Sequence, residues 1–231
     1  MDRPLTFARG LRDGAPFLLV IVPFGLLFGV VGTEAGLPLA QVMGLSVVVI
    51  AGAAQFTAVQ LMTEGAPTLV VVLSALAVNL RMAVYSAALT PHLGAAPLWQ
   101  RALAAYALTD QSFALGAAAF AEAPARPWPE KMRYYAGACA SVVPLWYACT
   151  LAGVLAGAAI PRSVPLDFAV PITFLALVTP MLRTLPHVVA AVTAVLVALL
   201  AHGLPWNGGL FVASAAAMLA GAEAERRLAR P

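Results

Sequence analysis

The sequence predicts an all-helical protein that crosses a membrane several times. Hydrophobic residues make up 62% of its 231 residues, charged residues make up 10%, and the mean hydropathy is +0.91. Soluble domains carry about 25% charged residues and avoid large exposed apolar patches. A helix needs roughly 20 residues to cross a bilayer, so the chain has room for about eight crossings joined by short loops. We therefore expect a single membrane domain over residues 1–231.

The first half of the chain holds four apolar runs. Turn-forming stretches such as GTEAGLP and TEGAP separate them, since glycine, proline and charged residues mark loops between apolar segments. A polar stretch at 122–133, EAPARPWPEKMR, then divides the chain into two halves. The expected membrane-spanning helices are 16–31, 39–62, 68–90 and 101–121.

The second half holds one long apolar run and three shorter ones. Pro171 and Pro180 interrupt the run at 166–182, and the run at 188–201 is also short. These two runs, within 166–201, are either two full spans or tilted, broken or re-entrant pieces, which would leave about seven crossings. The runs cover 134–160, 166–182, 188–201 and 206–221.

Lysine and arginine residues favour one side of this arrangement. With a cytoplasmic N-terminus, most of them fall in cytoplasmic segments, while Arg101 and Arg162 fall outside and Arg81 falls within the membrane. Cytoplasmic loops of membrane proteins carry such an excess. The sequence therefore predicts a protein of the plasma (inner) membrane with both termini in the cytoplasm. The net charge of +3 comes from basic residues beside apolar segments, which orientation in a lipid bilayer explains better than nucleic-acid binding does.

Two opposite charges lie inside apolar runs. Arg81 and Asp110 are each nine residues from the loop that joins the third and fourth predicted spans, about 13 Å along a helix. An ionisable residue in a membrane is costly and usually faces a partner or a water-filled path. We expect Arg81 to pair with Asp110, either as a clasp between two helices or as part of a route for a substrate or proton.

Polar neighbours of this pair favour the route. Tyr85 lies one helical turn from Arg81 on the same face, and Thr109 and Ser112 flank Asp110. Asn79 adds a polar group that points away from Arg81, because two residues rotate by roughly 200° in a helix. A clasp alone does not need this many hydrogen-bonding groups.

A second candidate site is the stretch AGAAQF at 51–56, which contains Gln55. Its small residues either let helices pack closely or mark a helix that opens, so that backbone groups and Gln55 contact a polar substrate. Close packing is the expected role of two G-x-x-x-G pairs, Gly25 with Gly29 and Gly153 with Gly157.

Motifs of enzymes and metal sites are missing from the sequence. It contains no H-E-x-x-H, G-x-S-x-G, C-x-x-C or Walker-type segment. We therefore expect no enzymatic activity, no metal and no cofactor, and any energy coupling must use an ion gradient or a separate subunit.

Five segments in order resemble one known family. PFGLLFGVV, AGAAQF, NLR with a following tyrosine, TD-x-S-F and LDFAVPITFLALVTPML are similar to segments of the AzlC family of branched-chain amino acid transporters. The resemblance covers about Pro23 to Arg183. It implies a large subunit that works with a small membrane partner, AzlD, to export amino acids such as valine.

These observations predict a transporter for a small zwitterion with an apolar side chain, and the resemblance implies that it exports this substrate. The alternatives are a transporter or channel for another small solute and a non-transporting membrane assembly subunit. The residues expected to bind the substrate or couple its transport are Gln55, Asn79, Arg81, Tyr85, Thr109, Asp110 and Ser112.

Overall fold

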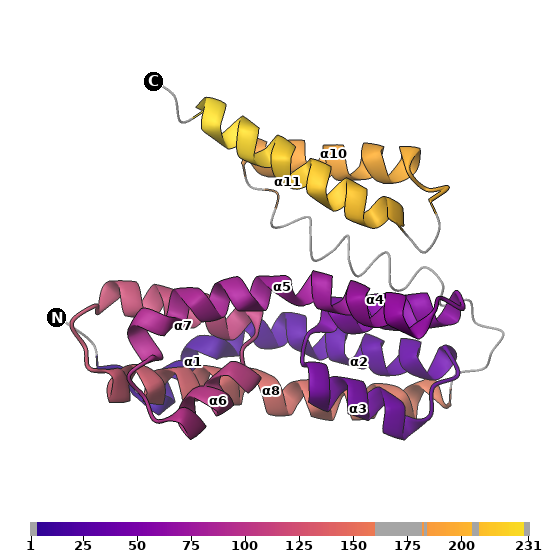
Figure 1. The fold of residues 1–231 in the computed structure, drawn as a ribbon. Coiled ribbons are helices and arrows are strands. Elements are labelled where there is room, and N and C mark those ends of the chain that lie inside the picture. Colours follow the sequence, from indigo (N-terminus) through magenta and orange to yellow (C-terminus); the bar gives the residue numbers. More distant parts are fainter. Residues whose placement is uncertain (1–3, 160–181, 183, 205–207, 229–231) are drawn as a thin grey trace. The chain divides into compact units, whose positions relative to one another are not determined.

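The computed structural model describes residues 4–159, 182, 184–204 and 208–228, and these residues form helices without any strand (Figure 1). The chain divides into two compact units, residues 1–63 with 67–165 and residues 64–66 with 166–231. The predicted all-α membrane class is confirmed. Three helices of the described part are long and apolar enough to cross a bilayer: Phe7–Glu34, Thr68–Leu93 and Trp128–Gly157.

The three long helices form the frame of the first unit. The first begins where the Thr6 hydroxyl accepts a hydrogen bond from the Arg9 backbone nitrogen at 3.2 Å, which caps the helix end. Its middle is a short 3-10 turn at Pro16, after which the helix continues. In order, the segments are α1 (Phe7–Gly14), η1 (Ala15–Phe17), α2 (Leu18–Glu34), α5 (Thr68–Leu93) and α8 (Trp128–Gly157).

Glycines bring α1–α2 and α8 into backbone contact. A Cβ at Gly29 would meet the carbonyl oxygen of Thr150 and lie 2.6 Å from the Val154 nitrogen, and one at Gly153 would meet the Leu26 carbonyl. The packing role predicted for the G-x-x-x-G pairs is therefore confirmed. The contacts advance in the same order along both helices, so the two run parallel: Gly10 faces Tyr134, Gly29 faces Thr150 and Gly157 faces Val30.

Residues 39–62, predicted as one span, are two helices that form a hairpin. α3 (Leu39–Val49) ends at Ile50, which has a left-handed φ of 41°, and α4 (Gly52–Thr63) follows. The Gln55 side chain donates to the Ser46 hydroxyl at 3.3 Å, although nine residues of straight helix would separate them by about 13.5 Å. The chain therefore turns back between α3 and α4, so of the two alternatives for this stretch the helix does open beside Gln55, while contact with a substrate stays a prediction.

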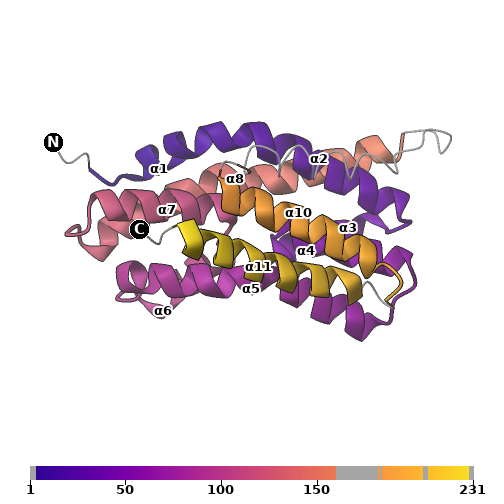
Figure 2. The ribbon, with the colours of Figure 1, turned by 90° about the horizontal axis from the view of Figure 1, so that it is seen from above.

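Residues 101–121, also predicted as one span, form a second hairpin. Its arms are α6 (Leu98–Tyr106) and α7 (Asp110–Glu122). The Tyr135 hydroxyl of α8 donates to the Ala104 carbonyl at 3.2 Å and lies 3.4 Å from the Ser112 hydroxyl, so both arms pass the same level of α8. Figure 1 and Figure 2 both show α3 and α4 together toward one end of the long helices, and α6 and α7 together toward the other.

The two hairpins change the predicted topology. The C-terminus of α5 lies at the same end as the N-terminus of α8, because Lys131 Nζ is 3.2 Å from His92 Nδ1. The N-terminus of α1 shares this end, since Arg9 is paired with Glu122 at 3.2 Å. Within residues 4–159 the chain thus has three long apolar helices and two hairpins in place of five spans. We call this end the basic end; it carries Arg9, Arg12, Arg101, Arg126, Lys131 and Arg133.

The remaining boundaries follow the sequence closely. α8 begins at Trp128, so the polar stretch predicted at 122–133 contributes only residues 123–127 to the connection between α7 and α8. In the second unit, the apolar runs predicted at 188–201 and 206–221 are helices that pack on each other, α10 (Leu185–Leu200) and α11 (Gly208–Leu228). Most of the run 166–182 lies outside the described residues, so the choice between spans and broken pieces there stays a prediction.

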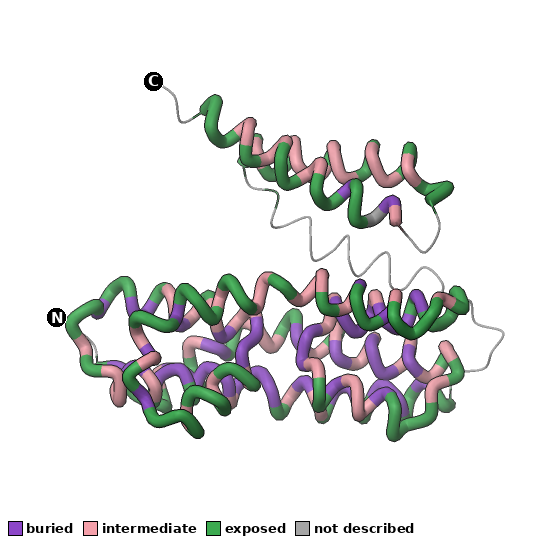
Figure 3. The backbone as a smooth tube through the Cα atoms, in the orientation of Figure 1, coloured by how far each residue is buried: buried purple, intermediate pink, exposed green. Residues whose placement is uncertain are grey.

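The core of the first unit lies where the hairpins meet the long helices. Buried residues line the inner faces of α2, α4 and α8 (Figure 3). Phe28 and Phe56 are 5.4 Å apart between ring centroids, and Phe28 stacks on Trp146 at 6.2 Å. These large side chains pack α4 firmly against α2 and α8.

Candidate functional site

Arg81 and Asp110 form an ion pair, as predicted. Arg81 Nη2 lies 3.1 Å from Asp110 Oδ2. The pair joins the middle of α5 to the first residue of α7, so it closes the tip of the second hairpin against a long helix. The side chains are 37% and 41% exposed, which leaves both charges accessible to a small polar molecule.

The start of α7 is built to hold a negative charge. Thr109 and Ser112 form a capping box: the Ser112 nitrogen donates to the Thr109 hydroxyl at 3.2 Å, and the Thr109 nitrogen donates to the Ser112 hydroxyl at 2.8 Å. Asp110 lies in the first turn, where the helix dipole favours an anion. Thr109 and Ser112 are buried and engaged in the turn, so they position Asp110.

Tyr85 completes the group around the pair. Its side chain lies close to both charges of the pair. Its ring stacks on Phe113 of α7, with ring centroids 4.1 Å apart and planes 6° apart. Tyr85 was predicted as a site residue because it lies one helical turn from Arg81. The structure adds that the stacked rings of Tyr85 and Phe113 form an aromatic surface beside the charged pair.

Gln55 belongs to a separate polar chain in the first hairpin. The Gln55 amide donates to Ser46, and the Ser46 hydroxyl lies 3.2 Å from the Thr150 hydroxyl of α8. All three residues are at most 1% exposed. These partners lie on α3 and α8, so the structure brings Gln55 to a different hairpin from Arg81 and Asp110. Ser46 and Thr150 were missed from the sequence because single hydroxyl residues are common in apolar helices.

Three buried polar atoms of predicted site residues have no hydrogen-bond partner among the described residues. They are Gln55 Oε1, Asn79 Oδ1 and Arg81 Nε. Buried polar atoms are nearly always paired, so such exceptions mark positions where a ligand, an ion or water completes the hydrogen bonding. No group of three His, Cys, Asp or Glu side chains that could hold a metal ion occurs in the part of the chain that is described.

Tyr106 joins the two hairpins. It lies at the end of α6, and its hydroxyl donates to the Val47 carbonyl near the end of α3 at 2.8 Å. A second contact of 2.8 Å links it to the Tyr147 hydroxyl of α8. The single proton of Tyr106 is used on Val47, so Tyr147 is the donor between the two phenols. This link was missed because it depends on two chain reversals that the sequence did not reveal.

The substitution Tyr106→Phe should weaken the contact between the hairpins. It leaves the Val47 carbonyl without its donor, which we expect to lower the free energy of unfolding by about 1–2 kcal/mol. Thermal unfolding of the purified protein in detergent measures this loss. Tyr147→Phe is the matched control: it removes one contact but leaves the Val47 bond intact, so its effect should be smaller. Equal losses for both variants would contradict the role of the Val47 bond.

Comparison with known proteins agrees with this picture. A membrane protein of Archaeoglobus fulgidus, named only as uncharacterized, is 29% identical over 221 residues, 94% of each chain. Inner membrane protein YgaZ of Escherichia coli is 26% identical over 176 residues, 74% of this chain and 71% of YgaZ. An uncharacterized membrane protein of Helicobacter pylori is 30% identical over 113 residues, 47% of this chain and 49% of that protein.

No solved structure matches the chain. The profile of the family described as AzlC protein matches residues 16–160, which include both hairpins and all of α2, α5 and α8 but not α1. The chain therefore belongs to the AzlC family of membrane proteins.

Proposed function

We propose that this protein exports branched-chain amino acids, valine, leucine and isoleucine, as the large subunit of a transporter. Its partner in this proposal is a small AzlD-type membrane subunit. Membership of the AzlC family supports a role in membrane transport. The observation that carries the proposal is the accessible Arg81–Asp110 ion pair at the tip of a hairpin, within a chain that has 10% charged residues.

A zwitterion suits this pair better than an ion of one sign. The substrate carboxylate can replace Asp110 at Arg81, while its ammonium group replaces Arg81 at Asp110. Every charge then keeps an opposite partner, which avoids the cost of an unpaired charge away from water. A substrate that separates Arg81 from Asp110 also frees α7 from α5, so binding biases the position of the second hairpin.

The surroundings of the pair favour an apolar side chain. The stacked rings of Tyr85 and Phe113 border it. Met82 packs against the same buried hydrophobic residues as these two rings. In this proposal Arg81, Tyr85 and Asp110 contact the substrate at the ion pair, and Thr109 and Ser112 position Asp110. Gln55, in the first hairpin, and Asn79 contact it at other points of its path. Gln55 Oε1 and Asn79 Oδ1 are free acceptors for an ammonium group.

The hairpins also sharpen the proposed orientation. With the second and fourth apolar runs treated as full spans, Arg101 lay on the side opposite to most of the positive charges. In the structure α6 begins at the basic end, so Arg101 lies on the same side as the other basic residues. The opposite end is formed by parts of residues 13–80 and 134–159, and these two ranges contain no lysine or arginine. We propose that the basic end faces the cytoplasm. The similarity to inner membrane protein YgaZ supports placement in the inner membrane.

Export of labelled amino acid tests the proposal. Cells that lack their own valine exporters, and that carry this chain with its small subunit, are loaded with labelled valine or leucine. We expect efflux well above that of cells carrying the small subunit alone. Flux of an organic acid or inorganic ion without amino-acid flux would favour another transport function. Proteoliposomes with both subunits that show no flux of any solute would favour an assembly subunit.

A further inference from the structure

A cavity lies between α5 and α6, apart from the Arg81–Asp110 pair. It has a volume of about 270 Å³, and its lining extends to the basic end, where α5 ends and α6 begins. α5 contributes Ser86, Leu89 and Thr90, α6 contributes Arg101, and its floor includes Leu108 and Tyr135. We call it the α5–α6 cavity.

The floor of the α5–α6 cavity is the turn that carries Asp110. Leu108 comes two residues before Asp110, and the Tyr135 hydroxyl contacts Ser112 of the capping box. Ser86 follows Tyr85, whose side chain lies close to Asp110. The cavity therefore ends just where the charged group begins, and the α6–α7 turn separates the two.

The lining matches an amino acid with an apolar side chain. Leucines of α5 and of the α6–α7 turn form apolar walls, and the hydroxyl of Ser86 adds a polar group. Arg101 supplies a positive charge, and it has no acidic partner among the described residues. A free guanidinium beside apolar walls binds a carboxylate well, because its donors match the two oxygens.

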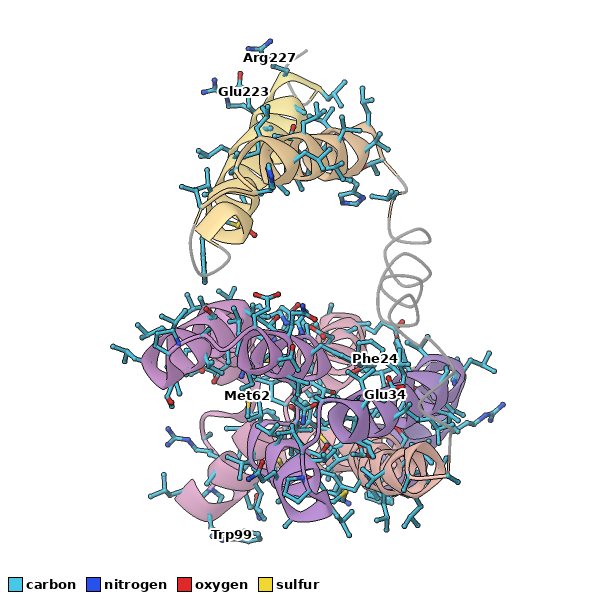
Figure 4. The ribbon with its side chains drawn as sticks, turned by 90° about the vertical axis from the view of Figure 1, so that its right-hand side faces the viewer. Phe24, Glu34, Met62, Trp99, Glu223 and Arg227 are labelled. Carbon is cyan, nitrogen blue, oxygen red and sulfur yellow. The ribbon has the colours of Figure 1, made fainter. Side chains whose placement is uncertain are left out.

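Of the helices that line the cavity, α6 can move most easily. No residue of α6 is buried in the described structure, whereas α4 buries six of its twelve residues. The Trp99 side chain of α6 is 64% exposed and points away from the neighbouring helices (Figure 4). Few buried contacts mean that a helix can move at low cost.

We infer that the α5–α6 cavity is a second substrate site on the basic side of the Arg81–Asp110 pair. We call it the outer site because it lies nearer to the basic end than the pair does. It holds the amino acid by its carboxylate at Arg101 and by its apolar side chain against Leu89 and Leu108. The substrate then reaches Arg81 and Asp110 when α6, which has no buried residue, moves. This inference rests on the proposed function and adds a separate binding step to it.

Leucine binding to the purified transporter in lipid nanodiscs, with its small subunit, tests the outer site. In Asp110→Asn we expect labelled leucine still to bind, at the outer site. Adding Arg101→Gln should weaken this remaining binding about tenfold or more, because a charge-assisted hydrogen bond is lost. Arg133→Gln, which removes a charge at the same end but outside the cavity lining, should leave it unchanged.

A cavity-filling variant separates shape from charge. Ala105→Leu places a larger apolar side chain in the cavity lining and keeps Arg101, so it should also weaken leucine binding in the Asp110→Asn background. Complete loss of binding in Asp110→Asn alone, or unchanged binding after Arg101→Gln, would overturn the outer site and leave the proposed function standing. A wild-type protein that binds no amino acid would overturn both.

Discussion

Asp110→Asn should reduce valine and leucine efflux at least about tenfold, while the protein is made at its normal level. The variant keeps the size of the side chain and its place in the first turn of α7, but it removes the charge that faces Arg81 at 3.1 Å. Arg81 then lacks a counter-charge, and the substrate ammonium lacks its partner. Efflux from cells loaded with labelled amino acid, corrected for protein abundance, measures the effect.

Glu122→Gln is the matched control for this change. Glu122 ends the same helix that Asp110 begins, and its side chain is 71% exposed in a pair with Arg9. The same chemical change there should leave efflux nearly unaltered, since exposed ion pairs contribute little. Undiminished transport by Asp110→Asn would remove Asp110 from the mechanism.

Exchange of the two charges separates a clasp from a substrate site. Arg81→Asp combined with Asp110→Arg restores an ion pair between α5 and α7 but reverses its direction. Normal abundance without efflux would show that the direction of the pair matters and that the pair orients the substrate. Restored efflux would mean that the pair acts as a clasp alone.

The sequence was sufficient to predict the pair because charge in an apolar chain is so costly. Arg81 and Asp110 had few possible partners, and an equal distance from one loop placed them at one depth. The two residues keep this common depth in the structure, because α5 ends and α6 begins at the same short connection. The prediction of the pair was right although the prediction of a straight fourth span was wrong.

The hairpins could not be predicted from hydropathy. Two arms of about 11 residues have the combined length of one full span, so length and composition are the same in both cases. The signals in the sequence were local: the run of small residues after Ile50, and Thr109 with Ser112, a possible helix cap within an apolar segment. Arg101, the misplaced positive charge, was the global signal that the second and fourth runs turn back.

Gly29→Ala should be among the most destabilising single substitutions in the first unit. The added methyl group would meet the Thr150 carbonyl and the Val154 nitrogen, which are backbone atoms of α8 and cannot rotate away. We expect a loss of about 1–3 kcal/mol in the free energy of unfolding, because α2 and α8 must separate to make room. Thermal unfolding in detergent, together with the amount of protein in the membrane, measures the loss.

Gly44→Ala provides the opposite case within the same unit. Gly44 lies inside α3, and no atom of the described residues comes within 4 Å of the position of its Cβ. Alanine favours a helix over glycine by up to about 1 kcal/mol, so this variant should be as stable as the wild type or slightly more stable. Equal destabilisation by the two substitutions would mean that α2 and α8 do not pack through Gly29. Equal tolerance would mean the same, because helix propensity alone would then decide both outcomes.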